Sequence, residues 1–137
     1  MPMAESPITV AIVNTNPDLV RTLRINLETA GFVVFEIHIE DIRLGQANVD
    51  SFLEQHDPKV IVYDVAPPFD QNYRFLEHLR HGTDFKGRQF VLTTVNLRRV
   101  QEIVGLDETV YEVVGLPSEI EEIVRAVKEA SRARPTR

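Results

Sequence analysis

The chain has 137 residues, a formal net charge of −6, 43% hydrophobic and 26% charged residues, and no cysteine. This length suits one domain that buries its own core, and the composition is ordinary for a globular protein. The lack of cysteine excludes disulfides, a thiolate nucleophile and a cysteine-ligated zinc site, and the negative charge disfavours nucleic acid as a partner.

The N-terminal sequence MPMAESPITV has no basic segment followed by an apolar one, and no apolar run has membrane-spanning length. We therefore expect a cytoplasmic protein without membrane contacts. Residues 1–7 are expected to form a tail, residues 8–131 one folded domain, and residues 132–137 a second tail.

The first half of the chain alternates strand and helix patterns. Ile8–Val13 is a nearly continuous apolar run, which is typical of a strand covered on both faces. Apolar residues at helical spacing across Leu19–Leu27 predict an amphipathic helix, and Phe32–Ile37 predicts a second strand. His38–Asn48 mixes charges without a clear period and is predicted to be a loop, with room for a helical turn. A short helix is expected over Asp50–Gln55.

The second half continues the same alternation. Its predicted elements are a strand over Val60–Tyr63, a helix over Asn72–His81, a strand over Phe90–Thr94, a helix over Leu97–Val104, a strand over Tyr111–Val114 and a last helix from Ser118 to about Ser131. This order predicts an α/β fold with a doubly wound parallel sheet and helices on both faces.

In such a sheet, function gathers at the carboxyl ends of the strands. Polar side chains, including an acid and hydroxyls, arrive at that rim from separate strands, together with a strand-end proline. The strand ends are Asn14 and Thr15, then Asp64, then Thr93 and Thr94, then Gly115, Leu116 and Pro117.

These segments resemble the receiver domain of bacterial response regulators, a CheY-like superfamily. The resemblance is carried by IVNTNPD, VIVYDVAPPFD, FVLTTVN and VVGLP, and by the typical spacing between Asp64, Thr94 and Leu116. It covers about residues 8–131. It implies five parallel strands in the flavodoxin-like order 2-1-3-4-5.

The resemblance also implies roles for individual positions. Asp64 corresponds to the aspartate that accepts a phosphoryl group from a partner histidine kinase, and Thr94 to the hydroxyl that contacts this group. Asn14 and Thr15 stand where the family has an acidic pair that helps to hold Mg²⁺. Leu116 stands where the family has a lysine.

These departures weaken the chemistry. Phosphoryl transfer depends on positioning and charge neutralisation, and Mg²⁺ prefers at least one carboxylate. Neutral oxygens at Asn14 and Thr15 predict weak Mg²⁺ binding at most, with Asp64 as the sole evident acid, and we predict no other cofactor. Arg98 or Arg99 could substitute for the missing lysine by reaching inward.

Val113 stands where the family usually has an aromatic residue whose position reports the switch between its two states. Tyr111 lies two residues earlier in the predicted strand, so it is expected on the same face.

Each candidate also has a plainer interpretation. Asp64 could be a strand-end aspartate that accepts hydrogen bonds from the following loop, and Thr94 a β-branched residue that caps a turn. Asn14 could be an ordinary turn residue. His78 and His81 share a predicted helix face, but without further ligands they are interpreted as surface histidines rather than a metal site.

No motif for an enzyme is present, so we expect a non-enzymatic, stand-alone, atypical receiver-like domain of a two-component phosphorelay. It would act through protein contacts, with weak or absent phosphorylation at Asp64. The alternatives are a conventional phosphoaccepting response regulator and, less favoured, a small-molecule-binding flavodoxin-like domain.

The expected partner is a sensor kinase or a downstream regulator. The family uses the face of the fourth helix, the fifth strand and the last helix, which here contains Arg98–Glu102, Tyr111 and the exposed side of Ser118–Lys128. A homodimer through this face is one form that the contact could take.

Overall fold

The computed structural model describes residues 7–14, 17–45, 48–82, 87–105, 107, 110–116 and 120–133, without the side chains at positions 14 and 80–82. The elements are β1 (Thr9–Asn14), α1 (Pro17–Thr29), β2 (Val33–His38), α2 (Ile39–Arg43), α3 (Val49–His56), β3 (Val60–Asp64), α4 (Phe69–Gly82), β4 (Gln89–Thr94), α5 (Leu97–Val104), β5 (Val110–Gly115) and α6 (Ile120–Arg132). The strands form one sheet in the order β2-β1-β3-β4-β5, and each of its neighbouring pairs is parallel.

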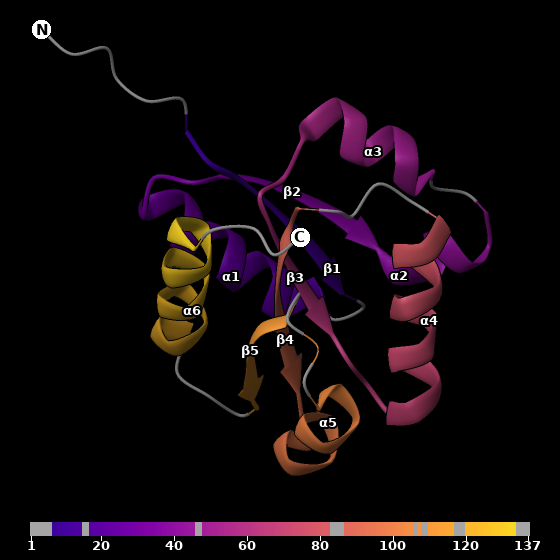
Figure 1. Cartoon of the computed structure of the whole chain (residues 1–137). Helices are drawn as coiled ribbons and strands as arrows, with labels where there is room; N and C mark the ends of the chain where they lie inside the picture. The colour runs from indigo at the N-terminus through magenta and orange to yellow at the C-terminus, as the bar shows by residue number, and fades with distance from the viewer. Residues whose placement is uncertain are drawn as a thin grey trace, which may run out of the picture.

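The sheet separates two helical layers, because successive side chains of a strand point to opposite faces. Figure 1 shows α1 and α6 on one side of the sheet and α2 to α5 on the other. Within β3, the side chains of Val60 and Val62 face α1 and α6, whereas those of Ile61 and Tyr63 face the other layer. Continuous apolar strands are therefore buried on both faces, as the sequence predicts.

The doubly wound sheet and its strand order are confirmed. One difference lies after β2, where the predicted loop contains the five-residue helix α2. The His38 side chain accepts a hydrogen bond from the backbone N–H of Glu40 and caps this helix, and Ile39 is buried against the sheet. A second difference is that α4 begins at Phe69, three residues before the predicted start.

A β-bulge interrupts the pairing of β4 with β5. Phe90 pairs with Val110 and Val91 with Glu112, so Tyr111 is the extra residue on β5. The hydroxyl of Tyr111 donates to Glu129 of α6 at 3.5 Å, whereas Val113 packs against the layer that contains α5. The prediction that these two residues share a face is wrong, because the bulge breaks the two-residue period between them.

An ion pair between a carboxylate and a guanidinium joins each edge strand of the sheet to a helix of the α1–α6 layer. On β2, Glu36 lies 3.3 Å from Arg24 of α1, and on β5, Glu112 lies 2.7 Å from Arg125 of α6. These pairs are partly exposed to solvent. They fasten both margins of the sheet to the helices that cover one face.

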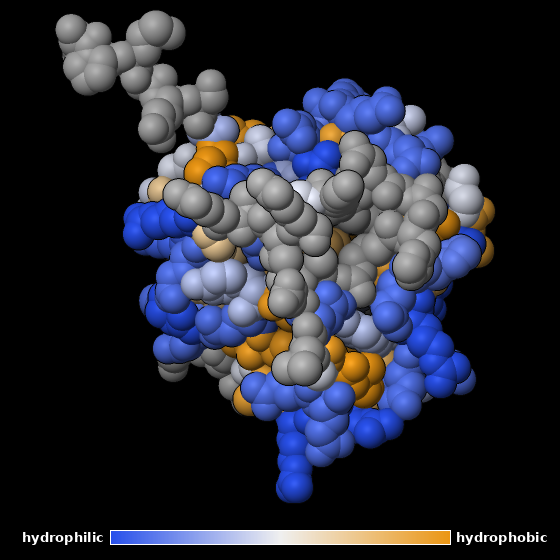
Figure 2. Space-filling view, in the orientation of Figure 1, coloured by the Kyte–Doolittle hydropathy of each residue, from blue (hydrophilic) through white to orange (hydrophobic). Residues whose placement is uncertain are grey.

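The surface in the orientation of Figure 1 is mostly hydrophilic, with hydrophobic areas near α5 in the lower part of the view (Figure 2). Val95 and Leu97, at the junction of β4 and α5, are 65% and 38% exposed. None of the helices in the described ranges combines the length and the apolar character that a membrane-spanning segment needs.

Candidate functional site

Asp64 ends β3, which lies in the middle of the sheet between β1 and β4. Its side chain is half-buried. The hydroxyl of Thr93, the residue paired with it on β4, donates a hydrogen bond to Asp64 Oδ1 at 2.7 Å. The Asp64 carboxylate therefore lies at the carboxyl ends of the strands and accepts a hydrogen bond from one neutral side chain, that of Thr93.

Burial raises the pKa of the Asp64 carboxyl above its ordinary value of 3.8, and the hydrogen bond from Thr93 offsets only part of this effect. The folded chain thus holds the Asp64 proton more tightly than the unfolded chain. Its contribution to stability is fully present below the unfolded pKa and is lost as the pH rises through the folded pKa. At neutral pH the ionised carboxylate is a cost to the folded state, which is common at functional sites.

Thr94 is fully buried at the end of β4. Its hydroxyl oxygen accepts a hydrogen bond from the backbone N–H of Asn96 at 3.2 Å, and the Asn96 side chain in turn caps α5. This contact lies in the turn between β4 and α5, and it agrees with the interpretation of Thr94 as a residue that caps a turn. The residue that touches Asp64 is Thr93, and the contact of Thr94 with a phosphoryl group stays a prediction.

The strand-five end of the rim is apolar. A Cβ added to Gly115 would lie 3.0 Å from the Cβ of Leu97, so glycine here allows α5 to begin close to β5. The next residue, Leu116, packs against the α1–α6 layer and donates its backbone N–H to the Thr94 carbonyl at 2.6 Å. At the position of the family lysine, the chain thus has a hydrocarbon side chain directed into a hydrophobic cluster.

The rim positions after β1 are Asn14 and Thr15. Thr15 lies outside the described residues, and for Asn14 only the backbone, paired with His38 of β2, is described. Their assignment as altered metal-site positions stays a prediction.

The two arginines considered as substitutes for the lysine are engaged elsewhere. Arg99 makes two contacts of 2.8 Å with the carboxylate of Asp70 and joins α5 to α4. The Arg98 side chain is 93% exposed and pairs with Glu102 at 3.6 Å. His78 is exposed on α4, as expected for a surface histidine, and the side chain of His81 lies outside the described part.

A pocket of about 190 Å³ opens beside Asp64. It contains Arg43 of α2, from the segment predicted to be a loop with room for a helical turn, and Asn72 of α4. The lining residues are Ile39, Glu40, Arg43, Asp64, Ala66, Pro67 and Asn72. The acidic first turn and basic last turn of α2 were the available signals for this helix, but five residues are too few to give an apolar period.

The residues of this pocket are a poor fit to Mg²⁺. The carboxylates among the lining residues are Asp64 and Glu40, and Glu40 lies 3.5 Å from the Arg43 guanidinium. Oδ1 of Asp64 already accepts from Thr93, and the Ala66 carbonyl accepts from Asn72 at 2.6 Å. No group of three or more His, Cys, Asp or Glu side chains suited to a metal ion occurs in the described ranges.

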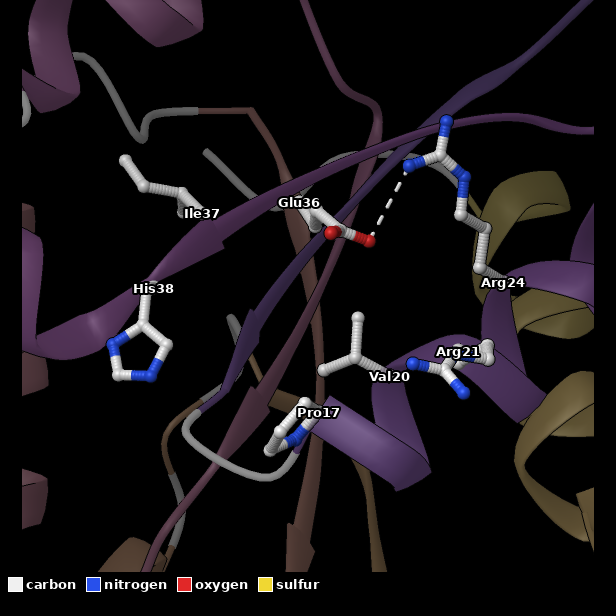
Figure 3. A pocket seen from close by; sticks show the side chains of 7 residues that line it. All are labelled: Pro17, Val20, Arg21, Arg24, Glu36, Ile37 and His38. Atoms are coloured by element: carbon white, nitrogen blue, oxygen red, sulfur yellow. Dashed lines mark hydrogen bonds and ion pairs between the residues drawn. The ribbon is translucent and has the colours of Figure 1, made fainter.

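A larger groove of about 330 Å³ lies between α1 and β2 (Figure 3). Arg24 and Glu36 face each other and pair across it, and Pro17 and Val20 supply apolar wall on the side of α1. Glu36 is the one acid among the lining residues, and its partner neutralises it. The groove does not include Asp64.

Solved structures of receiver domains share this architecture. A receiver domain (CheY-like) from Methylobacillus flagellatus aligns over 91% of this chain and 99% of its own, with a TM-score of 0.63 and 16% identity. The chemotaxis response regulator CheY4 of Vibrio cholerae aligns over 91% of this chain and 99% of its own, with a TM-score of 0.65 and 16% identity. A response regulator from Thermotoga maritima aligns over 93% of this chain and 100% of its own, with a TM-score of 0.70 and 13% identity. No protein-family model and no curated protein matches the sequence. The chain therefore has the fold of response-regulator receiver domains, and identities this low establish the fold alone.

Proposed function

We propose that this chain is an atypical receiver domain of two-component signalling, which acts through protein contacts and undergoes weak or absent phosphorylation at Asp64. The observation that carries the proposal is the composition of the rim. A half-buried carboxylate stands at the end of β3 with a threonine hydroxyl on it, while Leu116 contributes hydrocarbon where the receivers that it resembles have a lysine.

A receiver works by shifting a conformational equilibrium, and a phosphoryl group can shift it only through its different affinity for the two states. That difference depends on cations and donors that hold the phosphoryl oxygens. Without a lysine at position 116, and with neutral residues at Asn14 and Thr15, little of this difference remains. A domain of this kind is better suited to constant binding, or to regulation by its partner.

Treatment with acetyl phosphate and Mg²⁺ is expected to leave the intact mass of the protein largely unchanged. In a conventional receiver, a carboxylate oxygen attacks phosphorus and acetate leaves, and the negative charge that develops must be neutralised. Here the burial that raises the pKa of Asp64 also disfavours added charge at this position. Intact-protein mass spectrometry measures the result, with a receiver that has the complete acid and lysine set treated in parallel.

The double variant Asn14→Asp with Leu116→Lys provides the matched comparison, because it restores one acid and the lysine. Phosphorylation is expected to increase in this variant and to disappear again when Asp64→Asn is added. Substantial phosphoryl addition to the unaltered protein, abolished by Asp64→Asn, would instead support the alternative of a conventional phosphoaccepting regulator.

The surface that we propose for partner binding is formed by α5, β5 and α6. Leu97 of α5 is 38% exposed, and Tyr111, at the bulge of β5, is 37% exposed. Arg125 of α6 lies among Glu112, Glu122 and Glu129, and the Tyr111 hydroxyl donates to Glu129, so charged groups lie beside Tyr111. An apolar centre with a charged surround is the usual composition of a protein interface. Its occupant would be a sensor kinase, a downstream regulator or a second copy of the chain.

The variant Arg98→Glu with Tyr111→Ala is expected to reduce partner recovery in pull-downs, or to lower the solution mass if the chain is dimeric. Arg98 is well suited to the test, because its exposed pair with Glu102 contributes little to folding. Arg21→Glu on α1 is the matched control, since Arg21 is also exposed but lies outside this surface. Unchanged partners and unchanged solution mass in the double variant would exclude this surface as the binding site.

A further inference from the structure

The pocket beside Asp64 has an arginine in its wall. Arg43, the last residue of α2, lines it together with Asp64 from β3 and Asn72 from α4. Three elements that are separate in the sequence thus bring an acid, a guanidinium and an amide to one cavity of about 190 Å³. Such convergence of polar groups in a pocket is typical of a small-ligand site.

The guanidinium of Arg43 is held from several sides. Its Nη2 donates a hydrogen bond to Asn72 Oδ1, its Nη1 lies 3.5 Å from Glu40 Oε1, and its Cζ lies 4.9 Å from the centre of the Phe75 ring. Asn72 is itself fixed, because its Nδ2 donates to the Ala66 carbonyl at 2.6 Å. A cation oriented in this way loses less side-chain entropy when it binds a ligand than a free surface arginine does.

The pocket also has an unused capacity for an anion. Arg43 is the one basic side chain among its lining residues, and no ion pair joins it to Asp64 in the described part of the chain. A guanidinium carries several N–H donors in a planar fork that matches tetrahedral oxyanions, and the contacts with Asn72 and Glu40 leave some of them free. Three other candidates do not supply a cation to this pocket. The Leu116 side chain is apolar and packs against the α1–α6 layer. Arg98 pairs with Glu102, and Arg99 pairs with Asp70.

We infer that this pocket binds a small tetrahedral oxyanion of the phosphate class, with Arg43 of α2 as its cation and Asn72 as the residue that orients Arg43. The positive charge of the rim then comes from the helix after β2 instead of the loop after β5. The inference extends the proposed function, because it names what the rim recognises when covalent phosphorylation of Asp64 is weak. The same chemistry would serve a free phosphate or a phosphoryl group on Asp64, so the experiment must separate these two sources.

The test is a titration of the ¹⁵N-labelled full chain with inorganic phosphate, without Mg²⁺ or a phosphodonor, with ionic strength held constant by sodium chloride. Saturable shifts are expected for the Arg43 Nε–H signal and for the amides of Ala66 and Asn72, with roughly millimolar affinity. Arg43→Gln is expected to weaken binding at least about tenfold, which corresponds to the loss of one charge-assisted contact. Arg43→Lys should fall between the two, because it keeps the charge but loses the fork.

Two further variants make the result specific. Arg99→Gln removes an arginine that pairs with Asp70 and should leave the affinity for phosphate unchanged. Asp64→Asn removes one of the two carboxylates that line the pocket and should tighten the binding of free phosphate, whereas it would abolish covalent phosphorylation. Tightening by Asp64→Asn also tests the inference if Arg43→Gln does not fold.

The inference is overturned if phosphate causes no saturable shifts, if Arg99→Gln weakens binding as much as Arg43→Gln, or if Asp64→Asn weakens binding. These outcomes are independent of the proposed function. Stable phosphorylation by acetyl phosphate would contradict the proposed function and leave the titration with free phosphate valid. Loss of phosphate binding with partner binding intact would contradict the inference alone.

Discussion

Replacing Phe90 with alanine is expected to reduce the free energy of unfolding by about 3–5 kcal/mol, the usual cost of removing a fully buried phenyl ring. Phe90 has no exposed surface and lies on β4 in the layer between the sheet and α2 to α5. A domain of this size has roughly 5–15 kcal/mol of stability in total, so this single change removes a large part of it. Urea denaturation followed by circular dichroism measures the loss.

Leu44→Ala is the matched control, because Leu44 is also a large apolar residue but is 66% exposed. Its effect should stay within about 0.5 kcal/mol. A loss below about 1 kcal/mol for Phe90→Ala would mean that β4 is not enclosed by the two layers in solution.

Tyr63→Phe is expected to raise the free energy of unfolding by about 1 kcal/mol, because it removes a buried hydroxyl that has no hydrogen-bond partner among the described residues. Tyr63 is 1% exposed, and burial raises the pKa of its hydroxyl, so the group stays neutral throughout the usual pH range. Tyr63 borders a cavity of about 10 Å³ whose other lining residues are all hydrophobic. A water molecule there would lack the further polar partners that it requires.

Tyr73→Phe removes the same atom from a different environment and should have the opposite effect. The Tyr73 hydroxyl donates to Asp107 Oδ2 at 2.7 Å, so its removal should cost about 1–2 kcal/mol. If both variants lose stability by similar amounts, the Tyr63 hydroxyl has a partner in solution, and the expected gain is wrong.

The fold was largely predictable from local patterns. The uninterrupted apolar residues of β1, β3 and β4 indicate strands buried on both faces, and their alternation with helices limits the topology to a few arrangements. The strand order was predicted from the resemblance to receivers, and it is confirmed.

Features that depend on contacts between distant segments were not predictable. The bulge at Tyr111 adds one residue to a pairing, and an alternating pattern carries no sign of it. The register between β3 and β4 decides that Thr93, not Thr94, reaches Asp64. The resemblance assigned Thr94 to a phosphoryl group, and it gave no indication that the hydroxyl of Thr93 would donate to the Asp64 carboxylate.

From the sequence, Asp64 and the apolar residue Leu116 were predicted to lie at the rim. The presence of Arg43 in the pocket beside Asp64 was not predicted. Arg43 follows a stretch without apolar period, and the partners that fix it, Asn72 and Phe75, come from a helix about thirty residues away. A guanidinium acquires its position from such tertiary partners, and short polar helices give little warning of them.

The carboxylate–guanidinium pairs at the two margins of the sheet have a consequence for solubility. The outer edges of β2 and β5 are the places where the strand of another molecule could continue the sheet and begin an aggregate. Glu36 with Arg24, and Glu112 with Arg125, keep hydrated charges beside both edges. An incoming strand would have to strip water from these groups without offering them new partners. The same residues that join helix to strand within one molecule therefore discourage growth of the sheet from one molecule to the next.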